Sequence, residues 1–278
     1  MANLNYYKSK IKRFTLTDWL IAANLVMFLL TELIDFFFTR YISTSALILL
    51  GAKVNALIAL GEYWRLLSAM FLHANFLHVT FNMLALHIIG RDIERFYGKK
   101  KFLAIYFISG LVGSGFSYLF ISGVSVGASG AIFGLMGANL YLYKVNPNVY
   151  KRIYGTDFIM LIGINLLIGF IGPNIDIAGH IGGLIAGFTT AWALGLTHES
   201  STDVKRIPFQ AITLLLLIIP IVFGTLNQTS TPNLYLSGAY YYYSTGNETK
   251  ALATVDKGLK KFPDNTDLQS LQSQLNAQ

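Results

Sequence analysis

Four polar side chains stand out because they interrupt apolar stretches of the sequence. His78 and Asn82 occur in FLHVTFNM, Ser129 in VGASGAIFG and His180 in IAGHIGGLIAG. A serine hydroxyl becomes an effective nucleophile when a base takes its proton, and imidazole is well suited to that task near neutral pH. Asparagine and histidine can donate hydrogen bonds to the oxyanion of an acyl-transfer reaction. Together these residue types indicate acyl transfer, whereas Ser129 alone would favour a structural role.

The composition places these residues in a membrane. Of the 278 residues, 54% are hydrophobic and only 13% are charged, whereas soluble domains carry about 25% charged residues. Several runs approach or exceed the roughly 18 apolar residues of a membrane-spanning helix. The sequence therefore predicts an all-α polytopic membrane protein. The lack of cysteine excludes disulfides, thiol nucleophiles and thiolate metal sites.

The hydropathy pattern predicts seven transmembrane helices. Their approximate ranges are 18–38, 76–93, 102–122, 129–144, 157–172, 178–196 and 208–226. A cytosolic segment, 1–17, precedes the membrane domain, 18–226, and a polar tail, 229–278, follows it. Between the first two spans, residues 40–72 form a long external segment rich in Leu, Ala and Gly.

Basic residues orient the chain. They cluster before the first span and in the loops between the second and third, fourth and fifth, and sixth and seventh spans. These loops all lie on one side of the membrane under the seven-span count, and Lys and Arg favour the cytosolic side. We therefore expect a cytosolic N-terminus, a tail outside the cell, and no nucleic acid partner for the net charge of +7. The absence of a transit-peptide pattern and the compact size favour a bacterial plasma membrane.

Under this topology, the four polar residues lie at a similar depth. The second, fourth and sixth spans all run inward from outside, and His78, Asn82, Ser129 and His180 lie at their beginnings. His78 and Asn82 are four residues apart and share a helix face, whereas His87 faces elsewhere and is interpreted as structural. The fourth span is shorter than the hydrocarbon core of about 30 Å. We therefore expect the chain before Ser129 to dip into the membrane as irregular loop.

Glycines recur at four-residue spacing in the fourth and sixth spans. They are Gly130, Gly134, Gly179, Gly183 and Gly187. Small residues at this spacing let two membrane helices approach closely. We expect this contact to bring Ser129 and His180 within hydrogen-bond reach. Apart from Asp176, in the loop before His180, no Asp or Glu lies nearby in the sequence to orient the imidazole. The sequence therefore favours a Ser–His dyad over a triad.

The chain resembles the rhomboid intramembrane serine proteases over about residues 15–196. The matching elements are Trp64-Arg65, His73-x4-His78-x3-Asn82, Gly127-Ala128-Ser129-Gly130 and His180-x2-Gly183-x3-Gly187, in the family's order. The resemblance implies a six-helix rhomboid core, here followed by a seventh transmembrane helix and a small helical hairpin. It also implies no cofactor and no metal.

The resemblance assigns roles to individual residues. Ser129 would be the nucleophile, His180 the general base, and His78 and Asn82 the oxyanion-hole donors, with Phe133 stacked on the catalytic histidine. Gly127 would line the active site, and Trp64, Arg65, Gly183 and Gly187 would be structural. Substrates would be single-pass transmembrane proteins, cut near the outer membrane face where helix-weakening residues occur, after a small residue.

The tail from residue 229 differs sharply from the rest. Its sequence resembles one tetratricopeptide repeat, with an ordinary helical hairpin as the alternative. Ala251, Val255 and Leu259 share one face of its second helix, and a single solvated repeat needs a partner for such a face. We expect the tail to recruit a client protein, and its deletion to leave cleavage of a generic substrate intact.

Three other functions remain open on the sequence. A catalytically inactive rhomboid-like protein that binds membrane clients would be expected to lack Ser129 or His180, and both are present. A transporter would be expected to carry acidic residues at mid-membrane. A metal site built from His73, His78 and His180 would lack the HExxH motif or carboxylate cluster typical of such sites.

Overall fold

The computed structural model describes residues 14–38, 45–155, 157–172 and 175–277. These residues form helices and no strand, apart from an isolated antiparallel bridge between Lys53 and Ser125. Most of the predicted cytosolic segment, and residues 40–44 of the external segment, lie outside the described residues.

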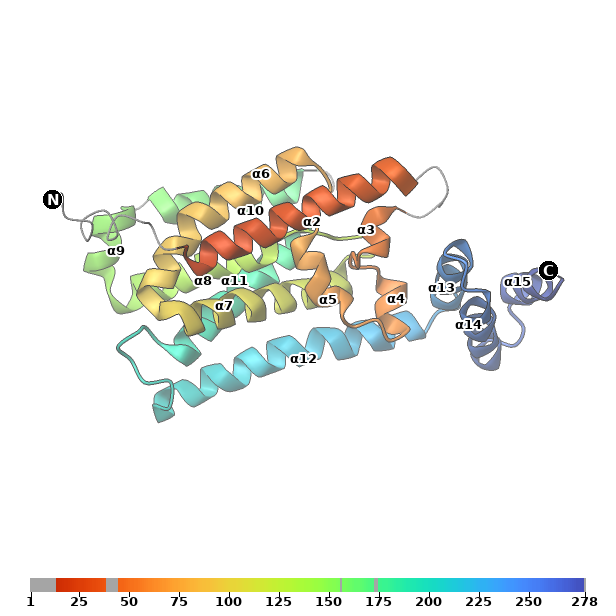
Figure 1. Cartoon of the computed structure of the whole chain (residues 1–278). Helices are drawn as coiled ribbons and strands as arrows, with labels where there is room; N and C mark the ends of the chain where they lie inside the picture. Colours follow the sequence, from red (N-terminus) through yellow and green to blue (C-terminus); the bar gives the residue numbers. More distant parts are fainter. Residues whose placement is uncertain (1–13, 39–44, 156, 173–174, 278) are drawn as a thin grey trace.

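The long helices lie side by side (Figure 1). They are α2 (Leu16–Phe38), α6 (Phe76–Ala85), α7 (Arg91–Phe120), α8 (Ser129–Val145), α10 (Asp157–Ile171), α11 (Ile177–Leu194) and α12 (Ile207–Thr229). A π-helical turn, Leu86–Gly90, joins α6 to α7, and α9 (Pro147–Tyr154) lies between α8 and α10. In the described part of the chain, four helices are long and apolar enough to cross a membrane, or five if α9 and α10 form one bent span.

The predicted second and third spans form one of these four, a run of 45 residues over Phe76–Phe120. The run bends at Gly98, whose φ of 75° and ψ of 164° are not helical. Glycine adopts positive φ without steric cost, so it can turn the chain between two crossings. α8 has 17 residues and starts at Ser129, as the short fourth span predicts.

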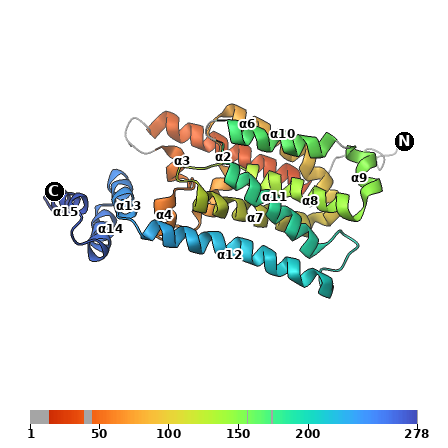
Figure 2. The same ribbon diagram turned by 180° about the vertical axis from the view of Figure 1, so that it is seen from behind.

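The centre of the bundle is formed by α7, α8 and α11. The carbonyl of Gly130 occupies the place that a Cβ on Gly183 would need, and the carbonyl of Gly134 does the same for Gly187. The backbones of α8 and α11 are therefore in direct contact. α10 is mostly exposed and lies at the same edge of the bundle as α6 (Figure 2).

The external segment folds into short helices at one end of the bundle. They are α3 (Ala46–Leu49), α4 (Asn55–Ala59) and α5 (Arg65–Ser68), followed by a 3-10 turn, Ala69–Phe71. Although the segment is a connection, Leu57, Ile58 and Leu72 are fully buried. Irregular backbone at membrane depth is tolerated when other protein covers it.

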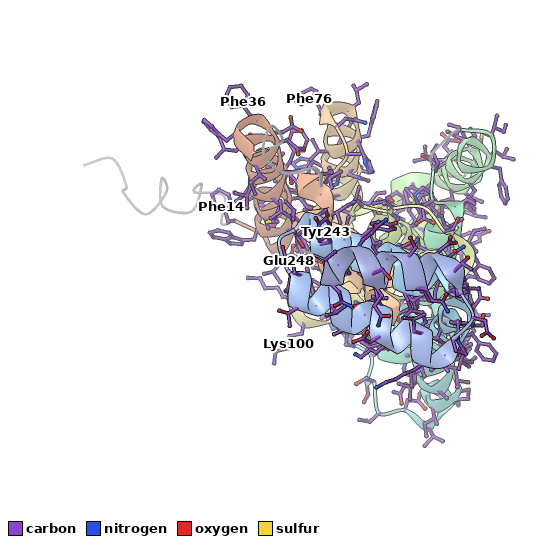
Figure 3. All side chains as sticks on the ribbon, turned by 90° about the vertical axis from the view of Figure 1, so that its right-hand side faces the viewer. Phe14, Phe36, Phe76, Lys100, Tyr243 and Glu248 are labelled. Atoms are coloured by element: carbon purple, nitrogen blue, oxygen red, sulfur yellow. The ribbon has the colours of Figure 1, made fainter. Side chains whose placement is uncertain are left out.

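The tail has three helices where the sequence analysis expected a hairpin of two. They are α13 (Asn233–Ser244), α14 (Glu248–Lys261) and α15 (Thr266–Asn276). Asn265 begins the additional helix, because its side chain accepts a hydrogen bond from the N–H of Leu268 and caps the first turn. The tail lies beyond the end of α12, at the end of the bundle that carries α3–α5 (Figure 1). In the end-on view, the helices carrying Tyr243 and Glu248 lie in front of the bundle (Figure 3).

Candidate active site

Ser129 is the first residue of α8 and follows the irregular loop 121–128. Two backbone contacts fix this loop to the external segment. Lys53 and Ser125 exchange hydrogen bonds of 3.0 and 3.1 Å, and the N–H of Gly127 donates to the carbonyl of Ala69 at 2.9 Å. Gly127 has φ 129°, a conformation that disfavours other residues. The contacts of the loop thus fix the position of Ser129 at the N-terminus of α8.

His180 lies in the first turn of α11. Asp176 caps this helix, because its Oδ1 accepts from the N–H of Gly179 at 2.8 Å and its carbonyl accepts from the N–H of His180 at 3.1 Å. The Nε2 atom of His180 lies 2.9 Å from the Oγ of Ser129. The ring of Phe133, one turn beyond Ser129, stacks on the imidazole with 4.3 Å between ring centres and 17° between planes. The structure therefore brings Ser129, Phe133 and His180 together.

Among the described residues, no carboxylate forms a hydrogen bond with the imidazole. The Nδ1 atom of His180 is buried without a hydrogen-bond partner in the described part of the chain. The two oxygens of the Asp176 side chain are taken up by the N–H of Gly179 and by the hydroxyl of Ser125, which donates at 2.5 Å. The arrangement is that of a pair, in which Asp176 makes its hydrogen bonds to Gly179 and Ser125 and none to the ring.

His78 and Asn82 approach the loop from α6. A Cβ placed on Gly127 would lie 2.8 Å from Nε2 of His78 and 3.5 Å from Nδ2 of Asn82. The Nδ2 group of Asn82 is buried and has no acceptor among the described residues. His73 packs edge-on against His78, with ring centres 5.0 Å apart. Two side-chain donors thus face the loop that precedes Ser129, whereas His87 is exposed and does not line the cavity described below.

A cavity of about 850 Å³ adjoins these residues. It is lined from α6, α8, α10 and α11, by residues that include His78, Asn82, Ser129, Phe133, Asn165 and His180. A second cavity, of about 30 Å³, also adjoins Ser129 and is lined by glycines of α7, α8 and α11. Ser129 therefore borders one large space and one small one.

Arg65 and Trp64 lie away from this cavity. Arg65 is 1% exposed, with its guanidinium 4.8 Å from the Trp64 ring centre, and it holds the external segment through the carbonyls of Ile48 and Ala52. The two residues thus stabilise the loop that contacts residues 121–128.

Two residues near the site, Lys53 and Ser125, were not predicted from the sequence. Lys53 is 1% exposed, and its Nζ donates to the carbonyls of Ile121 at 2.7 Å and Gly123 at 2.9 Å. Burial lowers the pKa of Lys53 to about 8, although the charge of Asp176 acts in the opposite direction. A lone lysine in an apolar external segment was the available signal, because a buried ammonium group needs acceptors.

Sequence comparisons relate this chain to known proteins. Residues 60–197 match the rhomboid domain. The chain is 38% identical over 198 residues to the rhomboid protease AarA of Providencia stuartii, which covers 60% of this chain and 70% of AarA. The chain belongs to the rhomboid family. With its apolar helices, this rhomboid is a multi-pass membrane protein.

Two further relatives are similar over a smaller share of their own length. The rhomboid protease GluP of Bacillus subtilis (strain 168) is 43% identical over 216 residues, 78% of this chain and 41% of GluP. RHOMBOID-like protein 5 of Arabidopsis thaliana is 42% identical over 155 residues, 54% of this chain and 50% of that protein. This rhomboid chain thus spans about half the length, or less, of these two relatives.

Proposed function

We propose that this rhomboid is an intramembrane serine endopeptidase that uses Ser129 and His180 as a dyad. The observation that carries the proposal is the distance of 2.9 Å between Ser129 Oγ and His180 Nε2, beside a cavity of about 850 Å³. A serine hydroxyl with only a structural role would not need a half-buried imidazole held by a helix cap and a stacked ring.

The geometry supports a two-step reaction. With its proton on Nδ1, neutral His180 accepts the Ser129 proton at Nε2 while Oγ attacks the substrate carbonyl. His78, Asn82 and the N–H of Ser129 stabilise the oxyanion, and His180 then protonates the leaving amine. Water attacks the resulting ester with His180 again accepting a proton, which releases the acid and restores Ser129.

Substrates are single-pass transmembrane proteins cut near the outer membrane face. The cavity of about 850 Å³ is lined from both α6 and α10, and an extended strand bound there would expose to Ser129 the carbonyls that a helix hides. The small cavity of about 30 Å³ beside Ser129 favours a small side chain before the scissile bond. Glycine, proline or polar residues near the cut would make the substrate helix easier to unwind.

The test is co-expression with a library of tagged single-span proteins, comparing the wild type with Ser129→Ala. We expect at least one library member to be cut by the wild type and by Ser201→Ala, in which a half-buried loop serine that does not line the cavity is replaced. Cleavage should fall below detection, roughly 10⁴-fold or more, in Ser129→Ala. Equal cleavage by wild type and Ser129→Ala would overturn the assignment. A chain that cuts no library member would instead favour the client-binding, inactive alternative.

The membrane is a plasma membrane, with the N-terminus in the cytosol and the tail outside. Two observations support this orientation. α2 begins, and α12 ends, at opposite ends of the bundle (Figure 1), and the basic residues of α9 and of Val204–Arg206 lie near the end where α2 begins. The tail exposes one face on which a protein client could dock. Protease shaving of intact cells should remove epitope tags fused after residue 278, and protection of such tags would contradict the orientation.

A further inference from the structure

The tail packs against α4 of the external segment and shares two apolar clusters with it. Ala56 packs in one cluster with Tyr235 and Val255, and Leu57 packs in another with Tyr242 and Ala251. The apolar face of α14 that was expected to need a partner protein is therefore covered within this chain, by α13 and α15 together with Ala56 and Leu57 of the external segment.

Polar contacts join the same two parts. Glu62 of the external segment accepts hydrogen bonds from Arg65 Nε at 2.7 Å, from the Tyr242 hydroxyl at 2.8 Å and from Lys250 Nζ at 3.3 Å. Nη2 of Arg65 donates to the hydroxyl of Tyr241 at 3.1 Å. Two of the three donors to Glu62 thus come from the tail, across 180 and 188 residues of sequence.

Arg65 links these tail contacts to the turn before Lys53. Its Nη1 group donates to the carbonyls of Ile48 at 2.7 Å and Ala52 at 3.2 Å, which closes the turn before Lys53. A buried guanidinium must have its donors satisfied. The position of Arg65 is therefore set both by Glu62 and the tail on one side and by residues 48–52 on the other.

Lys53 connects this turn to the catalytic loop. Its backbone pairs with Ser125, and its side chain holds the carbonyls of Ile121 and Gly123. The hydroxyl of Ser125 in turn donates to Asp176, the cap of the helix that carries His180. A continuous set of contacts thus runs from the tail to the elements that place Ser129 and His180.

We propose that Tyr242 and Lys250 of the tail are positioning residues for the active site. They fix Glu62 and Arg65, and thereby hold the external segment against the loop that precedes Ser129. The inference rests on the proposed protease function, and it differs from the expectation that the tail only recruits a client. The inner face of the tail, which carries Tyr242 and Lys250, then supports catalysis of every substrate. Its outer face, which carries Tyr240 and Lys257, is left free to bind a client.

The test compares two double variants of the full chain. Tyr242→Phe with Lys250→Met removes both tail donors to Glu62. Tyr240→Phe with Lys257→Met makes the same chemical changes at exposed positions of the same two helices. Since the chain has no cysteine, the background Ala56→Cys, at a position 9% exposed beneath the tail, reports docking by its rate of labelling with a water-soluble maleimide.

We expect the inner-face variant to raise the labelling rate about tenfold, because hydrogen bonds to a charged acceptor hold the docked state. The kcat for a single-span substrate should fall roughly three- to tenfold with KM nearly unchanged, because the substrate cavity does not include the tail. The outer-face variant should match the wild type in both. Restoring the cation with Lys250→Arg in place of Lys250→Met should recover part of the loss in kcat.

Two outcomes would overturn the inference. An unchanged labelling rate would mean that the two donors do not hold the tail, and a raised rate with unchanged kcat would mean that the docked tail does not position the site. Failure of the proposed function is distinct, since the wild type would then cut no substrate while its Ala56→Cys thiol stayed protected. If no substrate is cut but Ser129 still reacts with a fluorophosphonate, the dyad is intact, and the rate of that reaction replaces kcat in deciding the inference.

Discussion

The side-chain amide of Asn82 is buried and donates to no group in the described part of the chain. An unpaired buried donor is costly, and such a group is explained if its acceptor arrives with the substrate. Its neighbour His78 faces the same loop, so in the proposed mechanism both side chains would bind the oxyanion that forms on the substrate's carbonyl oxygen when Ser129 attacks.

We predict that Asn82→Ala lowers kcat by roughly 10²–10³ with a smaller change in KM, because an oxyanion donor acts mainly in the transition state. His78→Ala should behave similarly. Steady-state kinetics in detergent or proteoliposomes measure the split, with Thr80→Ala on the exposed side of α6 as the control. A raised KM with unchanged kcat would make Asn82 a binding or structural residue.

At the scale of single residues, the sequence indicated which side chains would come together where membrane burial made a polar residue conspicuous. Ser129, His180, His78 and Asn82 stand in apolar stretches, and the structure gathers them around one cavity. The sequence did not predict the partners of Lys53 or the hydrogen bond from Ser125 to Asp176. These contacts join residues that are 68 and 51 positions apart. Nothing in the local pattern indicates such pairings.

Between elements, the contact of α8 with α11 sets the distance from Ser129 to His180. The backbones touch at glycines, so any added side chain must push the helices apart. Helix existence and glycine spacing were readable from the sequence. The third tail helix was not, because its composition is polar and only the cap at Asn265 marks its start.

We predict that Gly183→Ala destabilises the protein by roughly 1–3 kcal/mol, as expected for overpacking, because its Cβ would overlap the Gly130 carbonyl. Thermal unfolding in detergent measures the loss. Gly163→Ala on α10, where an added Cβ meets nothing within 4 Å, is the matched control and should leave the midpoint unchanged or slightly raised. Equal midpoints for the two variants would contradict the close contact.

At the scale of the whole molecule, the tail and the external segment meet around Glu62. Burial opposes ionisation of this carboxyl, but hydrogen bonds from Tyr242, Arg65 and Lys250, together with the charge of Arg65, outweigh it and hold its pKa below the ordinary 4.5. A carboxyl with a lowered pKa in the folded state contributes stability that is fully present above its unfolded pKa. That contribution is lost as the pH falls through the folded pKa.

We therefore predict that the wild type is more stable than Glu62→Gln at neutral pH, and that this difference shrinks as the pH is lowered below 4.5. Thermal unfolding midpoints of both proteins across this pH range measure it. A difference that grows on acidification would contradict the ion pairs that join the tail to the external segment.

The most direct test of the proposed dyad is labelling by a fluorophosphonate, followed by identification of the modified residue by mass spectrometry. The reagent reacts with a serine only when a base activates its hydroxyl. We predict modification of Ser129 in the wild type and in Ser125→Thr, which keeps the hydroxyl beside Asp176, and none in His180→Ala or Ser129→Ala. Labelling of Ser129 at an equal rate without His180, or of another serine in the wild type, would contradict the dyad.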